Sequence, residues 1–176
     1  MSRKRVRSLV MAAVCVALGL FLPFLTGQIP QIGSKLSPMH IPILLCGFLC
    51  GWQYGLIAGF ITPILRSVLF GMPPMMPTAA AMAFELAAYG AFTGILYRLL
   101  PRNVLNVYVT LVASMLLGRV VWGVASMLLY MANGSQFTFA IFLTGAFVNA
   151  VPGIVLHIVI IPPIVLALRK AKILEA

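Results

Sequence analysis

Long apolar runs, separated by short polar or proline- and glycine-containing breaks, dominate the chain. Runs of this kind are typical of transmembrane helices, because about 20 apolar residues span the hydrocarbon core of a bilayer. The breaks divide the chain into six predicted spans, at residues 8–27, 38–51, 54–71, 78–100, 105–132 and 137–168. The pattern therefore predicts an all-α integral membrane protein, a six-transmembrane-helix bundle that forms a single transmembrane domain over residues 1–176.

The number of spans depends on how residues 38–71 are divided. The second and third spans are short, and with the connection at residues 52–53 they read as a tight helical hairpin. One continuous span across this region is the alternative, and it would reduce the count to five.

The distribution of basic residues favours six spans. With the N-terminus inside, six spans place nine basic residues on the inner side and only Lys35 on the outer side. Five spans would put one basic cluster on the wrong side of the membrane. The basic start and first apolar run resemble a signal peptide, but no convincing cleavage site follows, so we expect this run to be a retained first helix. We predict that both termini are cytoplasmic.

The composition excludes several function classes. The chain is 62% apolar and only 8% charged, whereas soluble domains carry about 25% charged residues. The net charge of +10 is divided among clusters that flank apolar runs, without the aromatic-basic groups of a nucleic-acid surface. Cys15, Cys46 and Cys50 have no nearby histidine or acid to complete a metal site. We therefore expect no metal, no cofactor and no nucleic-acid partner.

Charged residues within the predicted spans are the most informative positions. Arg66, Glu85 and Arg119 each cost at least a few kcal/mol in a bilayer and rarely occur there without a role. From the helical rise per residue, these three fall in the outer half of the membrane with His40 and Asn149, whereas His157 lies deeper.

Helical spacing adds polar and aromatic neighbours to these charges. Arg119 shares a helix face with Trp122 and Ser126, and Glu85 shares one with Tyr89. Apolar walls with a few polar and aromatic groups are typical of a small-molecule site. The predicted substrate-binding residues are Arg66, Glu85, Arg119, Asn149, His40, Trp122, Ser126 and Tyr89.

Two arginines against one carboxylate suggest the charge of the ligand. One arginine can pair with Glu85, which leaves the other without a carboxylate within the spans. A bound anion would satisfy it, and a carboxylate suits the guanidinium fork. The alternative is that Arg66 extends its side chain to the outer surface. With a single carboxylate in the spans, no Ser/His/Asp set and no phosphate-cradling loop, no enzyme activity is predicted.

Several stretches resemble the substrate-binding S component of energy-coupling factor transporters. They are Leu36-Ser37-Pro38-Met39-His40-Ile41-Pro42, residues 66–74, Ala83-Phe84-Glu85 and Asn149-Ala150-Val151-Pro152-Gly153. A basic start, six short spans and an alanine-rich first helix add to the resemblance, which covers nearly the whole chain.

The resemblance implies a function and a set of partners. It implies the high-affinity binding subunit of an importer of the ATP-binding-cassette class, in a bacterial plasma membrane, taking up a vitamin or related micronutrient. The implied partners are a membrane coupling protein and two cytoplasmic ATPases. Ala13 and Ala17 match the face of the first helix that contacts the coupling protein in this family, and residues 28–37 and 72–77 match its gating loops.

Alternatives remain for both the identity of the substrate and the class of function. We expect a carboxylate-bearing vitamin, and pantothenate is the first candidate. Biotin, folate, nicotinate and lipoate are the other carboxylate candidates. A neutral vitamin such as pyridoxine or riboflavin is a further alternative. A small ion-coupled secondary transporter or channel is the second hypothesis, although a channel would carry polar residues along its full length. A membrane enzyme or sensor is the third.

Overall fold

The computed structural model describes residues 3–26, 36–132, 138–145 and 150–171, and these residues form helices without any strand. The main helices are α1 (Arg3–Phe21), α3 (His40–Cys50), α4 (Trp52–Phe70), α5 (Ala80–Leu99), α6 (Val104–Ala132), α7 (Phe139–Leu143) and α8 (Val151–Lys170). A 3₁₀ turn, η1 (Leu22–Thr26), follows α1, and a π-helical turn, η2 (Met75–Ala79), precedes α5. The all-α prediction is confirmed.

Five segments among the described residues are long and apolar enough to cross a membrane. They are Arg5–Leu25, Trp52–Phe70, Met75–Leu99, Val104–Ala132 and Val151–Lys170. The sixth apolar helix, α3, has 11 residues and is about 16 Å long at 1.5 Å per residue. On length alone, α3 covers about half of the hydrocarbon core.

A single glycine separates α3 from α4. Gly51 adopts a φ of 87°, which glycine tolerates without a steric penalty, and α4 begins at the next residue, Trp52. The turn is therefore shorter than the predicted connection at residues 52–53, and the region forms two helices rather than one continuous helix.

The last predicted span, 137–168, differs from the structure. The structure describes two helices there: α7 ends at Leu143, and α8 begins at Val151 with Pro152 in its first turn. Proline is favoured at this position because the first-turn N–H groups have no intrahelical acceptor to lose.

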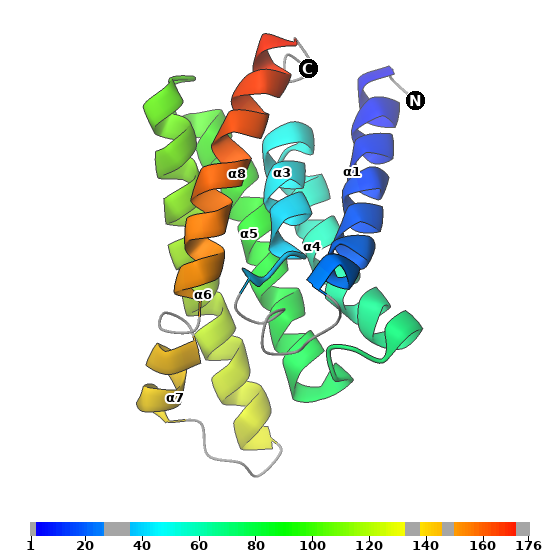
Figure 1. Ribbon diagram of the computed structural model, residues 1–176, viewed down its shortest axis with the longest axis vertical. Coiled ribbons are helices and arrows are strands. Elements are labelled where there is room, and N and C mark those ends of the chain that lie inside the picture. Colours follow the sequence, from blue (N-terminus) through cyan, green and yellow to red (C-terminus); the bar gives the residue numbers. More distant parts are fainter. Residues whose placement is uncertain (1–2, 27–35, 133–137, 146–149, 172–176) are drawn as a thin grey trace.

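The two charged ends of the chain lie at the same end of the bundle (Figure 1). Arg169, in the last turn of α8, donates a hydrogen bond of 2.5 Å to the carbonyl of Arg102 between α5 and α6. The basic residues of the α5–α6 connection and of the end of α8 therefore share one side, as the six-span prediction required.

Helix α5 is the central element, because it packs against α3, α4 and α6 (Figure 1). Its contact with α4 is backbone to backbone: a Cβ on Gly90 would lie 2.2 Å from the carbonyl oxygen of Gly55, and one on Gly59 would lie 2.2 Å from that of Leu86. The small residues Gly55 and Gly59 therefore allow close packing between two helices of the same chain.

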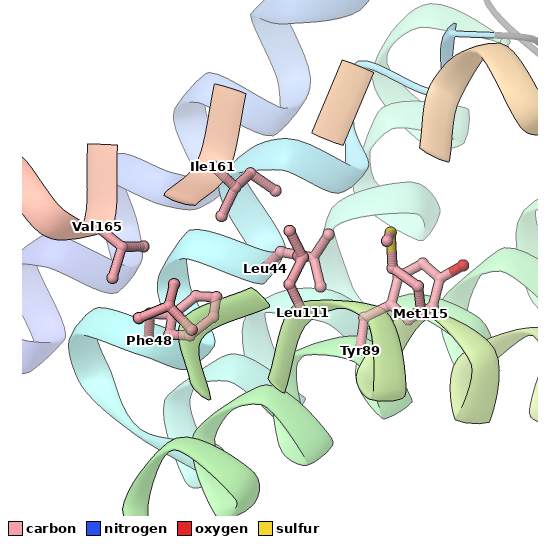
Figure 2. Packing of buried hydrophobic residues seen from close by; sticks show 8 residues of the cluster. Leu44, Phe48, Tyr89, Leu111, Met115, Ile161 and Val165 are labelled. Carbon is pink, nitrogen blue, oxygen red and sulfur yellow. The ribbon is translucent and has the colours of Figure 1, made fainter. Parts of the chain in front are cut away.

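An apolar cluster fills the space between α3, α5, α6 and α8 (Figure 2). Its buried members are Leu44, Phe48, Tyr89, Val107, Leu111, Met115, Ile161 and Val165. Tyr89 lies at its edge, where its ring joins the cluster while its hydroxyl group reaches the polar residues described next.

Candidate functional site

Glu85, on α5, is the centre of a buried polar cluster. Glu85 is only 1% exposed, and its carboxylate contacts side chains from three helices. Arg119 Nη1 of α6 lies 3.0 Å from Oε1, and the Tyr89 hydroxyl donates to Oε1 at 2.8 Å. His40 Nε2 of α3 lies 3.7 Å from Oε2. The carboxylate is therefore surrounded by groups that can donate hydrogen bonds or carry positive charge.

Local sequence explains how these side chains converge. Glu85 and Tyr89 are one helical turn apart and share a face of α5. His40 is the first residue of α3, directly after the turn that begins with Ser37. Gly118 leaves room for the Tyr89 ring, since a Cβ there would lie 2.1 Å from Tyr89 Cδ1. The close approach of α6 to α5 brings the next residue, Arg119, to the carboxylate.

His157 joins this cluster through contacts with His40 and Ser37. Its ring stacks on that of His40, with 6.0 Å between ring centroids and an interplanar angle of 23°. Its Nε2 lies 3.3 Å from the carbonyl oxygen of Ser37; because a carbonyl can only accept, Nε2 carries the proton. The sequence predicted a deeper position for His157 than for His40, whereas the structure brings the two rings together.

Several buried polar atoms of α3 and α6 have no hydrogen-bond partner within the described part of the chain. They are Arg119 Nε, His40 Nδ1 and Nε2, Ser126 Oγ and Ser114 Oγ. Most buried polar atoms in folded proteins find a partner, so the unpaired atoms of Arg119 and His40, which both lie beside Glu85, point to a missing one. Ser126 lies two turns from Arg119 on the same face of α6, as the spacing predicted.

Arg66 makes a different set of contacts. It is 3% exposed and donates a hydrogen bond to the carbonyl of Leu20 at the end of α1. Its guanidinium carbon lies 5.0 Å from the ring centroid of Phe24 and 5.5 Å from that of Phe70. These contacts join the neighbouring ends of α1 and α4, and none of them involves Glu85, Arg119 or His40.

The remaining predicted residues fall in three places. Trp122 stacks on Phe142 of α7, with 6.4 Å between centroids, and packs against Gly145. Asn149 lies outside the described residues, as do most of residues 28–37. Ala13 and Ala17 are exposed on the outward face of α1.

A scan against protein-family models gives a match over residues 7–165, to the family described as ECF transporter, substrate-specific component. The chain belongs to this family. No curated protein and no solved structure matched the chain. The resemblance stated from sequence is thus confirmed at the level of the family.

Family membership decides the function class. A substrate-specific component of an ECF transporter is a substrate-binding transport subunit for a vitamin or related micronutrient, and it is not an enzyme. It acts with an ECF module of coupling protein and ATPases. With the apolar helices, the family also identifies a multi-pass membrane protein.

Proposed function

We propose that this S component binds a carboxylate-bearing vitamin at the cluster around Glu85, with pantothenate as the first candidate. The observation that carries the proposal is the buried Arg119 Nε, which has no acceptor among the residues that the structure describes, although the same guanidinium pairs with Glu85. The proposed contacts are Arg119, Glu85, His40, Tyr89 and Ser126.

A count of donors and acceptors supports an anionic ligand. A guanidinium has five N–H donors, and Tyr89, His40 and Ser126 add further donors, whereas Glu85 is the single carboxylate among these side chains. The cluster therefore lacks acceptors. A ligand carboxylate supplies two acceptor oxygens and can bridge two donors of the guanidinium fork. Trp122, Arg66 and Asn149 stay predicted contacts without this support.

The proposed topology has six spans, with α3 as a short sixth. Although α3 has 11 residues, it packs against α1, α4, α5 and α8, so neighbouring helices rather than lipid surround most of it. Six crossings, in a single domain over residues 1–176, are consistent with both termini on the cytoplasmic side of a bacterial plasma membrane.

The proposed partners are one membrane coupling protein and two cytoplasmic ATPases. Ala13 and Ala17 are one turn apart, exposed and small, so a partner helix could approach α1 closely along this face. Their exposure in the single chain supports a face that is available to another membrane protein.

The experiment that tests the proposal is mass spectrometry of the small molecules released from gently purified, heat-denatured protein. We expect one vitamin per chain, with a carboxylate, and none in the variant carrying both Glu85→Gln and Arg119→Gln. A stoichiometric neutral vitamin would contradict the carboxylate proposal. An empty protein that also fails to respond to a panel of vitamins in thermal-shift assays would contradict binding at this cluster altogether.

A further inference from the structure

We propose that the α5–α6 connection and the end of α8 together bind the headgroup of an anionic phospholipid. We call the four basic residues at this place, Arg98, Arg102, Arg169 and Lys170, the basic end. The inference goes beyond the proposed vitamin site and does not depend on it, because no residue of the cluster around Glu85 takes part.

A hydrogen bond between two distant parts of the chain brings the basic end together. Arg169 Nη1 of α8 donates to the backbone carbonyl of Arg102 at 2.5 Å, which uses one of the five N–H donors of the guanidinium. The carbonyl of Pro101 accepts two further hydrogen bonds, from the backbone N–H of Asn103 at 2.8 Å and from Asn106 Nδ2 at 2.6 Å. These bonds hold the connection in place, so the Arg169 guanidinium lies within side-chain reach of Arg102.

No carboxylate balances the basic end within the described part of the chain. The chain has two acidic residues, of which Glu175 lies outside the described residues and Glu85 is buried, at 1% exposed. Arg98, Arg102 and Lys170 are exposed. Like charges on neighbouring side chains repel one another, and an anion between them offsets this repulsion. A phosphate group suits the place, because its oxygens accept charge-assisted hydrogen bonds from several basic side chains at once.

Exposed leucines lie directly beside the basic end. One candidate membrane span ends at Leu99 of α5 and the next begins at Val104 of α6, so Arg102 lies between two apolar segments. Leu99 is 73% exposed and Leu105 is 71% exposed. At the end of a membrane span, apolar side chains contact acyl chains, and basic side chains just beyond them reach the headgroups. The arrangement therefore fits both parts of a phospholipid.

These apolar neighbours favour a phospholipid over other anionic partners. An acidic surface of a soluble protein would match the charges, but it would leave the exposed leucines without an apolar partner. A free phosphate ion would also use the charges alone. Each basic residue near an anionic membrane surface strengthens binding by about fivefold, so the four residues of the basic end can give a marked preference for an anionic headgroup.

Native mass spectrometry of the full chain, titrated with single lipids in a neutral detergent, measures the affinity for each lipid. The probes are phosphatidylglycerol and phosphatidylcholine with the same acyl chains. We expect phosphatidylglycerol to bind at least 25-fold more tightly, and Arg102→Gln to weaken its binding about fivefold. Arg102→Gln with Arg169→Gln should weaken it about 25-fold. Binding of phosphatidylcholine should not change.

Arg5→Gln is the matched control for Arg102→Gln. Arg5 is also an exposed arginine at this end of the bundle, but it belongs to α1, which packs against α3 and α4 and lies apart from the end of α8 (Figure 1). Its substitution should leave the affinity for phosphatidylglycerol unchanged. Arg102→Gln should not disturb folding, because the hydrogen bond from Arg169 ends on a backbone carbonyl that the variant retains.

Four outcomes would overturn the inference, and none of them affects the proposed vitamin site. The first is equal affinity of the unaltered protein for the two lipids. The second is an equal loss in Arg102→Gln and Arg5→Gln, which would show a general attraction to the net charge of +10. Competition by glycerol phosphate at the concentration of the lipid would assign the basic end to a free phosphate. Loss of assembly with the ECF module in Arg102→Gln, with lipid affinity unchanged, would assign it to a protein partner.

Discussion

The guanidinium of Arg119 lies 3.0 Å from the carboxylate of Glu85, and the two side chains are only 9% and 2% exposed. They come from α6 and α5, two neighbouring helices of the bundle. Burying a charge costs desolvation free energy, and in a buried ion pair the attraction between the two charges offsets this cost. The pair is therefore both a link between two helices and the charged centre of the proposed binding site.

The first prediction concerns the stability of this pair. Glu85→Gln or Arg119→Gln alone leaves one buried charge without its partner and should lower the free energy of unfolding by about 3–5 kcal/mol. The double variant should cost clearly less than the sum of the two. Equilibrium denaturation in mixed micelles measures all three. Additive losses would show that the two charges do not depend on each other.

The second prediction separates charge from geometry at Arg119. Arg119→Lys keeps a positive charge beside Glu85 but replaces the planar fork with a single ammonium group. We expect vitamin affinity to fall more than about tenfold, because the lysine cannot present two parallel donors to a carboxylate. Binding calorimetry with the vitamin found by mass spectrometry checks this. An unchanged dissociation constant in a folded variant would remove Arg119 from the site.

The third prediction tests Arg66, which the sequence placed among the ligand contacts. Arg66→Lys should lower the free energy of unfolding by about 1 kcal/mol, because the guanidinium no longer faces Phe24 and Phe70. Vitamin affinity should change less than about threefold. The same calorimetry as for Arg119→Lys measures it. A tenfold loss of affinity would instead support the sequence-based prediction that Arg66 contacts the ligand.

Some members of the buried cluster, which stays a candidate site, could be predicted from residue type and helical spacing. Charges in an apolar chain are rare enough to stand out, so Glu85 and Arg119 were identified, and spacing along one helix added Tyr89 and Ser126. The all-helical fold followed from hydropathy for a similar reason, since the bilayer restricts spanning segments to few structures.

The parts that could not be predicted depend on contacts between helices. Spacing within α4 cannot show that Arg66 turns towards Leu20 and Phe24, because both belong to another helix. Nor could the sequence show that His157 stacks on His40, because the two residues belong to different helices. Nor does length predict that Gly51 alone can form the turn between α3 and α4.

The fourth prediction concerns the contact between α4 and α5. Gly90→Ala should destabilise the protein strongly, by about 2 kcal/mol or more, because its Cβ would lie 2.2 Å from the carbonyl oxygen of Gly55 and the helices would have to separate. Val68→Ala, at a position of α4 that is 67% exposed, is the control and should change stability by less than about 0.5 kcal/mol. Equal effects of the two substitutions would argue against close packing of α4 on α5.

The fifth prediction separates binding from transport. Ala13→Trp or Ala17→Trp adds a bulky ring to the exposed face of α1, away from Glu85, and should leave vitamin affinity unchanged. The same ring would block the close approach of a coupling protein, so uptake by cells that express the complete transporter should be abolished. Val120→Trp is the matched control, because Val120 is 56% exposed on α6, on the other side of the bundle from α1 (Figure 1). Normal uptake by both alanine variants would remove this face from the partner interface, and loss of uptake in all three would point to a general intolerance of added bulk rather than a specific surface.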